Sequence, residues 1–146
     1  MTHGLDTSFL VAVEILEHPR HGDAWALLRK LLADGDRFAL APQVLAEFVH
    51  TTTDPRRFQT PLSMEVVLGH SARWWNATEV DHAATDDQAM TLFHGWMLRH
   101  RLGRKRVLDT SLAATYRRHG ITSLLTLNAR DFAIFGEFTC PAEMKR

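Results

Sequence analysis

The sequence predicts an α/β fold in which helices surround a mostly parallel β-sheet. Short apolar segments with branched side chains alternate with longer segments whose apolar residues recur at helical spacing. Glycine or proline marks most of the junctions, and such alternation is typical of parallel strands joined by helices. No linker, low-complexity tract or solenoid repeat interrupts the 146 residues. We therefore expect one domain over residues 1–146.

Glycine and proline set the boundaries in the first half of the chain. Pro19 cannot continue the amphipathic helix before it, Gly35 is placed as the stop of the next helix, and Pro42 suits the first position of a third. HGLD and RFALA are short enough for buried strands. The predicted elements are, in order, strand 3–6, helix 8–17, helix 22–35, strand 37–41 and helix 42–52.

The second half repeats the alternation with one long helix. Residues 84–103 carry Asp86 and Asp87 in the first turn and basic residues near the end, which favours a helix. Residues 121–127, ITSLLTL, are the most strand-like segment and follow a helix that Gly120 ends. The remaining predicted elements are helix 62–75, strand 78–81, helix 109–120 and strand 137–141.

The composition excludes several classes of protein. No apolar run approaches the roughly 18 residues of a membrane span, and the N-terminus lacks the basic and apolar regions of a signal peptide. The single cysteine, Cys140, excludes an internal disulfide and a cysteine-rich zinc site. The 17 Lys and Arg balance 17 Asp and Glu, which argues against nucleic-acid binding through bulk charge. We expect a cytoplasmic protein without membrane contact.

The tetrapeptide LDTS occurs twice, beginning at Leu5 and at Leu108. Its polar side chains can accept hydrogen bonds from a first helical turn, so each copy could begin a helix. The alternative is that Asp6 and Asp109 are carboxylates of one site. Asp6 ends the first predicted strand, and ligands of open α/β sheets bind beyond the carboxyl ends of the strands. Local structure alone leaves both interpretations open.

Two further acids fall near the same edge of the predicted sheet. Glu47 lies in the helix after the second strand, and Asp131 follows the strand 121–127. Clustered carboxylates suit Mg²⁺ or Mn²⁺, which relieves their repulsion and can activate water against a phosphodiester. Spacing alone does not establish such a site, because 17 acids in 146 residues form many apparent constellations.

Four segments in order carry these acids: LDTSFLVAV, PQVLAEFVHTTTDPRRF, RVLDTSLAATYRRHGI and LLTLNARDF. Together they resemble the PIN domain family, specifically the toxin ribonucleases of bacterial VapBC-type toxin–antitoxin pairs. Their order and spacing match, and the resemblance covers most of the chain. It implies a three-layer α/β/α sandwich with a mostly parallel central sheet.

The resemblance also implies four acidic site residues that bind Mg²⁺ or Mn²⁺. Asp6, Glu47 and Asp109 match the family's first three acids position by position. At the fourth position Asp131 is the carboxylate available, and Asn128 stands where the family often has an acid or Asn. The number of metal ions therefore stays open.

Three polar residues are implied to support the acids. Ser8 matches a hydroxyl that in the family hydrogen-bonds a metal-binding carboxylate or the substrate, with plain helix capping as the alternative. Thr126 and Asn128 follow the strand that precedes the fourth acid, and Asn128 could position a water or bind a phosphate oxygen.

The implied function is that of a metal-dependent endoribonuclease, the toxin of a type II toxin–antitoxin pair, which hydrolyses RNA phosphodiesters with metal-activated water. The implied partners are an antitoxin protein and a second copy of the chain, as a homodimer. One alternative is a catalytically idle PIN-like module that binds RNA or protein. Another is a phosphoaspartate enzyme with Asp6 as nucleophile, but LLTLNARDF lacks the lysine that such sites use.

Basic residues beside these segments could bind RNA phosphates without sequence choice. One pair follows the helix predicted over 42–52, and a basic run precedes Asp109. The alternative is that the run is a solvated helix end. The residues selected are Arg56, Arg57, Arg104, Lys105 and Arg106.

Overall fold

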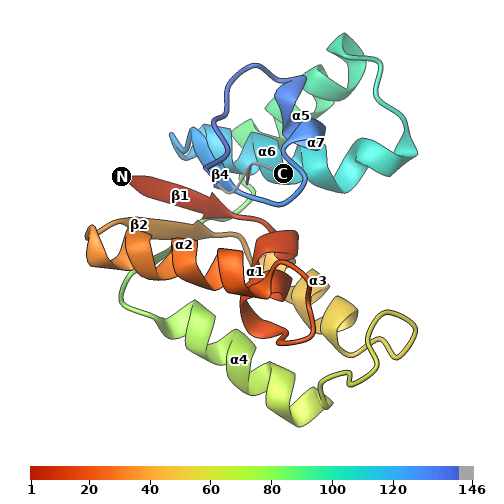
Figure 1. Cartoon of the computed structure of the whole chain (residues 1–146). Coiled ribbons are helices and arrows are strands. Elements are labelled where there is room, and N and C mark those ends of the chain that lie inside the picture. The colour runs from red at the N-terminus through yellow and green to blue at the C-terminus, as the bar shows by residue number, and fades with distance from the viewer. Residues whose placement is uncertain (142–146) are drawn as a thin grey trace.

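The computed structural model describes residues 1–141 as an α/β sandwich (Figure 1). Within these residues the sheet has four strands in the order β3-β2-β1-β4, and every neighbouring pair is parallel. The strands are β1 (Thr2–Leu5), β2 (Arg37–Leu40), β3 (Val80–His82) and β4 (Ser123–Leu125). The helices are α1 (Thr7–Glu14), α2 (His21–Ala33), α3 (Pro42–Thr52), α4 (Met64–Asn76), α5 (Asp87–Arg99), α6 (Val107–Arg118) and α7 (Arg130–Ala133), with a 3₁₀ turn η1 (Arg104–Arg106) before α6.

Helices lie on both sides of the sheet. In Figure 1, α5, α6 and α7 gather on one side of β1 and β2, and α1, α2, α3 and α4 lie on the other. The strands β1, β2 and β4 are buried along almost their whole length, as expected for parallel strands covered on both faces. The predicted fold class is confirmed. In the described part of the chain, no helix combines the length and apolar character needed to cross a membrane.

Two predictions for the second half were wrong, and one short helix was not predicted. The helix predicted to begin at Asp109 begins at Val107, because η1 runs directly into it. Arg106 therefore occupies the N-cap position, and the second LDTS lies inside the helix. The short helix α7 was not predicted. Within the described residues, segment 137–141 forms no strand and contributes only a single bridge to β4.

Strand β1 packs against α6 without room for a side chain at Gly4. A Cβ atom there would lie 2.8 Å from Cδ2 of Tyr116 and 2.9 Å from Cδ2 of Leu124. Both neighbours are buried core residues that have no space to withdraw. This close approach brings the carboxyl end of β1, which precedes Asp6, to the helix that carries Asp109.

Candidate active site

Asp6 lies where β1 ends and α1 begins. Its side chain caps α1, since Oδ1 accepts from the Thr7 N–H at 2.8 Å. Oδ2 accepts from the Ser8 hydroxyl at 3.0 Å and from the Thr126 hydroxyl at 2.6 Å. Only 8% of the residue is exposed. Asp6 is therefore both a helix cap and a carboxylate held in one orientation.

The same hydroxyls fasten the loop after β4 to Asp6. Ser8 Oγ accepts from the Leu127 N–H, and Thr126 Oγ1 accepts from the Asn128 N–H, each at 3.0 Å. Asn128 itself lines the pocket described below. The structure thus brings the three predicted supporting residues together around Asp6, while their part in a reaction stays a prediction.

A buried tyrosine joins the elements that carry the acids. The Tyr116 hydroxyl donates to the Leu5 carbonyl oxygen at 2.5 Å and accepts from the Ala41 N–H at 3.2 Å. Leu5 directly precedes Asp6, and Ala41 is the N-cap residue of α3. Tyr116 itself lies on α6, about two turns beyond Asp109. Burial raises the pKa of its hydroxyl, so the neutral, hydrogen-bonding form persists.

Three of the four predicted acids line one pocket with a volume of about 570 Å³. They are Asp6, from the end of β1, Glu47, from α3, and Asp109, from the first turn of α6. Asp131, in α7, is not among the lining residues, but its charge raises the pKa of both Asp6 and Asp109. The four acids are therefore electrostatic neighbours.

The surroundings oppose ionisation of these acids. Desolvation raises the pKa of Asp109 to about 6, and the charges of Asp6, Asp131 and Glu47 add to this shift. Desolvation, followed by the charge of Asp6, also raises the pKa of Glu47, although that side chain lies at an exposed rim. For Asp6, desolvation outweighs the hydrogen bonds that lower its pKa. Acids perturbed in this way are typical of cation-binding and catalytic sites.

The basic run before Asp109 divides into an inward and an outward part. The Arg106 guanidinium donates to the Asp131 carbonyl oxygen, and its charge lowers the pKa of Asp109. Arg106 Nε is buried and has no hydrogen-bond partner within residues 1–141. Arg104 and Lys105 are exposed on η1. Arg106 therefore braces α7 against the site, whereas its two neighbours face solvent.

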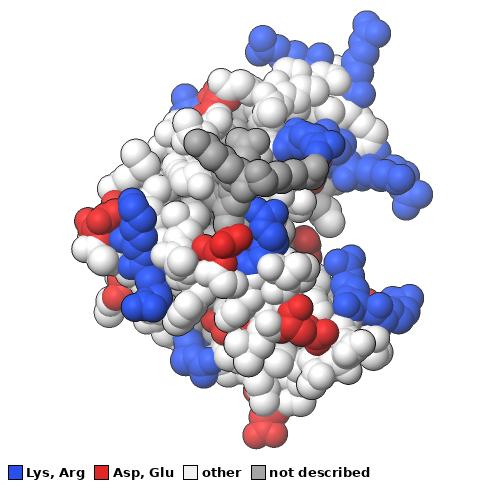
Figure 2. All heavy atoms as spheres, viewed as in Figure 1, with Lys and Arg blue, Asp and Glu red and all other residues white. Residues whose placement is uncertain are grey.

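The pocket also holds residues that sequence analysis did not select. His18 and Arg20, from the loop before α2, and Phe58, from the loop after α3, line it beside the predicted Arg57. Arg56 is 87% exposed and is not a lining residue. The loop before α2 shows no periodicity or motif, so no sequence signal marked His18 and Arg20, whereas Phe58 is the last residue of the family-like segment PQVLAEFVHTTTDPRRF and was passed over. Figure 2 shows a hollow at the right-hand edge with acidic atoms set inside it and basic side chains on both lips.

The donor set fits a hard divalent cation. Carboxylate oxygens are the ligands that such ions prefer, and a cation would offset the desolvation and the mutual repulsion that raise the pKa values of these acids. Within the described residues, no three Asp, Glu, His or Cys side chains already stand close enough to hold a metal ion. Among the pocket's carboxylates, Asp6 is held by hydrogen bonds from the Thr7 N–H and from the Ser8 and Thr126 hydroxyls.

The chain is thus a parallel α/β sandwich with acids gathered beyond the carboxyl ends of its strands. No family model matches the chain. It is 28% identical over 140 residues to Ribonuclease VapC24 of Mycobacterium tuberculosis, which covers 90% of this chain and 90% of that protein. Over most of its length the chain is therefore similar in sequence to a VapC ribonuclease.

Solved structures have the same fold. VapC20 of Mycobacterium tuberculosis, a sarcin–ricin loop cleaving toxin, matches 92% of this chain and 95% of its own with a TM-score of 0.69 and 20% identity. VapBC2 from Rickettsia felis, bound to a DNA fragment from its promoter, matches 96% of this chain and 97% of its own, with a TM-score of 0.64 and 16% identity. At these identities the likeness shows the fold.

Proposed function

We propose that this protein is a metal-dependent endoribonuclease and the toxin of a type II toxin–antitoxin pair. The observation that carries the proposal is a pocket of electrostatically coupled acids at the carboxyl ends of the strands, each acid destabilised in its charged form. Sequence similarity to Ribonuclease VapC24 over most of both chains supports the same activity.

Asp6, Glu47, Asp109 and Asp131 are the proposed ligands of Mg²⁺ or Mn²⁺. A bound ion of this kind supplies positive charge at the scissile phosphodiester and favours attack by water. Ser8 and Thr126 keep the Asp6 carboxylate in one orientation through their hydrogen bonds. Asn128 lines the pocket, and its side-chain amide would bind a phosphate oxygen or a water.

The proposed partners are an RNA substrate, a cognate antitoxin and a second copy of the chain, all in the cytoplasm. VapC-type neighbours in complexes named VapBC support the antitoxin. An antitoxin arginine placed among the acids would be an effective inhibitor, because it supplies the positive charge that they lack.

Cleavage of labelled RNA by the purified protein with Mn²⁺ or Mg²⁺ tests the proposal. A sarcin–ricin loop hairpin belongs among the substrates, since VapC20 cleaves that loop. We expect cutting that EDTA and Asp109→Asn both abolish. Asp87→Asn, at an exposed acid in the first turn of α5, is the matched control and should cut at the wild-type rate. RNA binding without cleavage would instead favour an idle binding module.

A further inference from the structure

The acidic pocket has a second set of lining residues with the opposite chemistry. His18, Arg20, Arg57 and Phe58 line it together with the acids. They come from two loops, residues 15–20 between α1 and α2 and residues 53–63 between α3 and α4. In a site that bound only a cation, positively charged arginines beside the carboxylates would weaken binding, because they repel the cation.

The two loops are fastened to each other. The Glu17 carboxylate accepts from the Gln59 N–H at 3.2 Å and from the Thr60 N–H at 3.0 Å, which links the first loop to the second. Within the second loop, Asp54 Oδ1 accepts from the Arg56 N–H at 2.9 Å. These contacts between carboxylates and backbone N–H groups hold the two loops together as one wall of the pocket.

His18 is oriented as a hydrogen-bond donor. Its Nδ1 accepts from the Arg20 N–H at 3.0 Å, so the proton of the neutral ring lies on Nε2. Within residues 1–141, no group accepts a hydrogen bond from that Nε2. The half-buried ring therefore presents a donor with unused capacity at the pocket.

The two arginines of the wall are only loosely paired. Arg20 Nε lies 4.0 Å from Asp23 Oδ2, and Arg57 Nε lies 4.0 Å from Asp54 Oδ2, both at the limit of an ion pair. Arg57 nevertheless acts on the pocket, because its charge lowers the pKa of Glu47. Both guanidinium groups thus remain available to an incoming anion.

We propose that His18, Arg20 and Arg57 form a phosphate subsite that binds the RNA backbone beside the scissile phosphodiester. An RNA strand is the ligand class that would use both linings, since one phosphate would lie at the acids when they hold a cation and a neighbouring phosphate would contact the wall. Phe58 offers the ribose or base an apolar surface. The subsite deepens the proposed ribonuclease function and rests on it.

The test measures binding of a fluorescein-labelled sarcin–ricin loop hairpin by anisotropy, with Asp109→Asn protein as the non-cleaving parent. Adding Arg20→Ala or Arg57→Ala should weaken binding by about tenfold and flatten the slope of log K against log salt by about one. Arg56→Ala is the matched control, because this neighbouring arginine lies outside the pocket, and it should leave both quantities near those of the parent.

A separate readout tests the histidine. His18→Ala should weaken binding without changing the salt slope, because the neutral ring donates a hydrogen bond and no charge. His18→Gln retains an N–H donor at a comparable reach and should restore part of the affinity. Thermal melting of each variant confirms that the wall has not unfolded.

Equal effects of Arg56→Ala and Arg57→Ala would overturn the subsite, and so would a parent protein that does not bind the hairpin. The proposed function fails separately, if wild-type protein with metal cuts no RNA. In that case the contrast between Arg56→Ala and Arg57→Ala still decides whether the wall binds phosphates.

Discussion

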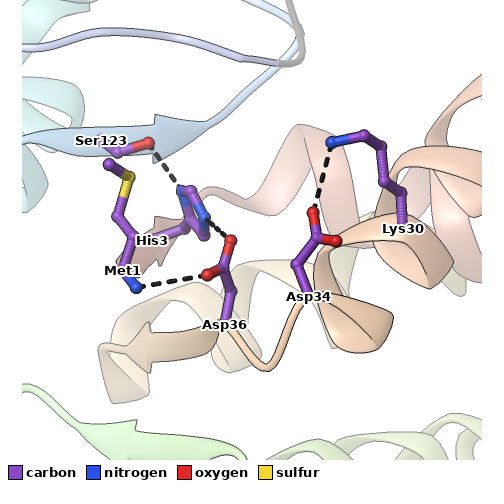
Figure 3. A network of polar contacts seen from close by, with 6 residues as sticks. All are labelled: Met1, His3, Lys30, Asp34, Asp36 and Ser123. Atoms are coloured by element: carbon purple, nitrogen blue, oxygen red, sulfur yellow. Dashed lines mark hydrogen bonds and ion pairs between the residues drawn. The ribbon is translucent and has the colours of Figure 1, made fainter.

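The two ends of the central sheet hold similar polar residues in opposite electrostatic states. At the amino ends of the strands, His3 Nε2 pairs with Asp36 at 3.0 Å, and His3 Nδ1 pairs with the Ser123 hydroxyl at 2.7 Å (Figure 3). The Met1 amine also donates to Asp36, at 3.2 Å. These partners, the His3 hydrogen bond first, lower the pKa of Asp36. At the carboxyl ends, the surroundings raise the pKa of Asp6 and of the other acids in its pocket.

The polar cluster at the amino ends of the strands has its charges compensated, which is typical of a structural role, whereas the acids at the carboxyl ends do not. Ser123, His3 and Asp36 are the residue types of a hydrolytic triad, but Ser123 is 3% exposed and His3 2%, so a substrate cannot reach them. Their contacts instead tie β1 to β4 and to the residue before β2. The acids at the carboxyl ends keep an energetic cost that a bound cation would remove.

A substitution among the acids at the carboxyl ends of the strands, where charge is uncompensated, should have the largest effect. Asp109→Asn preserves the shape of the side chain but removes a charge from the proposed cation site. We expect the rate of RNA cleavage to fall on the order of 1000-fold, because bound metal ions contribute several kcal/mol to the transition state. Single-turnover cleavage, measured beside circular dichroism, separates lost chemistry from lost fold. A folded variant that cuts at the wild-type rate would refute the site.

A substitution at the amino ends of the strands, where the charges are compensated, should lower the free energy of unfolding and leave RNA cleavage unchanged. His3→Ala leaves the buried Ser123 hydroxyl without its partner and opens a cavity, so we expect the free energy of unfolding to fall by about 2–3 kcal/mol. Urea denaturation measures this loss, and cleavage by the folded variant should match the wild type. A folded His3→Ala protein without activity would show that the two ends are not independent.

Tyr116→Phe should affect both properties moderately. The ring keeps its packing against Gly4, but the Leu5 carbonyl and the Ala41 N–H lose their common partner. We expect a loss of about 1–2 kcal/mol in the free energy of unfolding. The acids should also bind Mn²⁺ about tenfold more weakly, because the hydrogen bonds that link α6 to the end of β1 and to the start of α3 are lost. If a calorimetric titration shows unchanged Mn²⁺ affinity, the Tyr116 hydroxyl does not support the acids, and the residue contributes only to packing.

The smallest expected effect is a pH-dependent gain of stability. The pKa of Asp109 is raised from its ordinary value of 3.8 to about 6 in the folded protein. Folding therefore takes up a proton at pH values between 3.8 and about 6. Stability from this group is therefore present below about pH 4 and is lost as the pH rises through 6. In EDTA at pH 7.5, Asp109→Asn should be more stable than the wild type by about 1 kcal/mol, after allowance for solvent screening.

Thermal melting at two pH values checks this sign. A gain of about 1 kcal/mol corresponds to roughly 2–4 °C for a chain of this size, and it should vanish at pH 4. A variant that melts below the wild type in EDTA at pH 7.5 would contradict the claim that the uncompensated acids destabilise the metal-free fold.

Sequence reasoning reached the order of the elements because periodicity and turn residues are local signals. It placed Asp6 at a strand end for the same reason. The start of α6 at Val107 was missed, since the basic run before it contains no capping residue and continues as η1. His18, Arg20 and Tyr116 were missed because tertiary contacts place them: the Glu17 carboxylate links the two loops, and a hydroxyl bridges two strand ends.

Mn²⁺ titration by calorimetry at pH 7.5 tests the contrast between the two ends most directly. Three proteins are compared: the wild type, Asp109→Asn at the carboxyl ends and Asp36→Asn at the amino ends. We predict that the wild type and Asp36→Asn bind Mn²⁺ with the same affinity and that Asp109→Asn loses most of it. Equal binding by all three proteins, or loss of binding only in Asp36→Asn, would contradict the account.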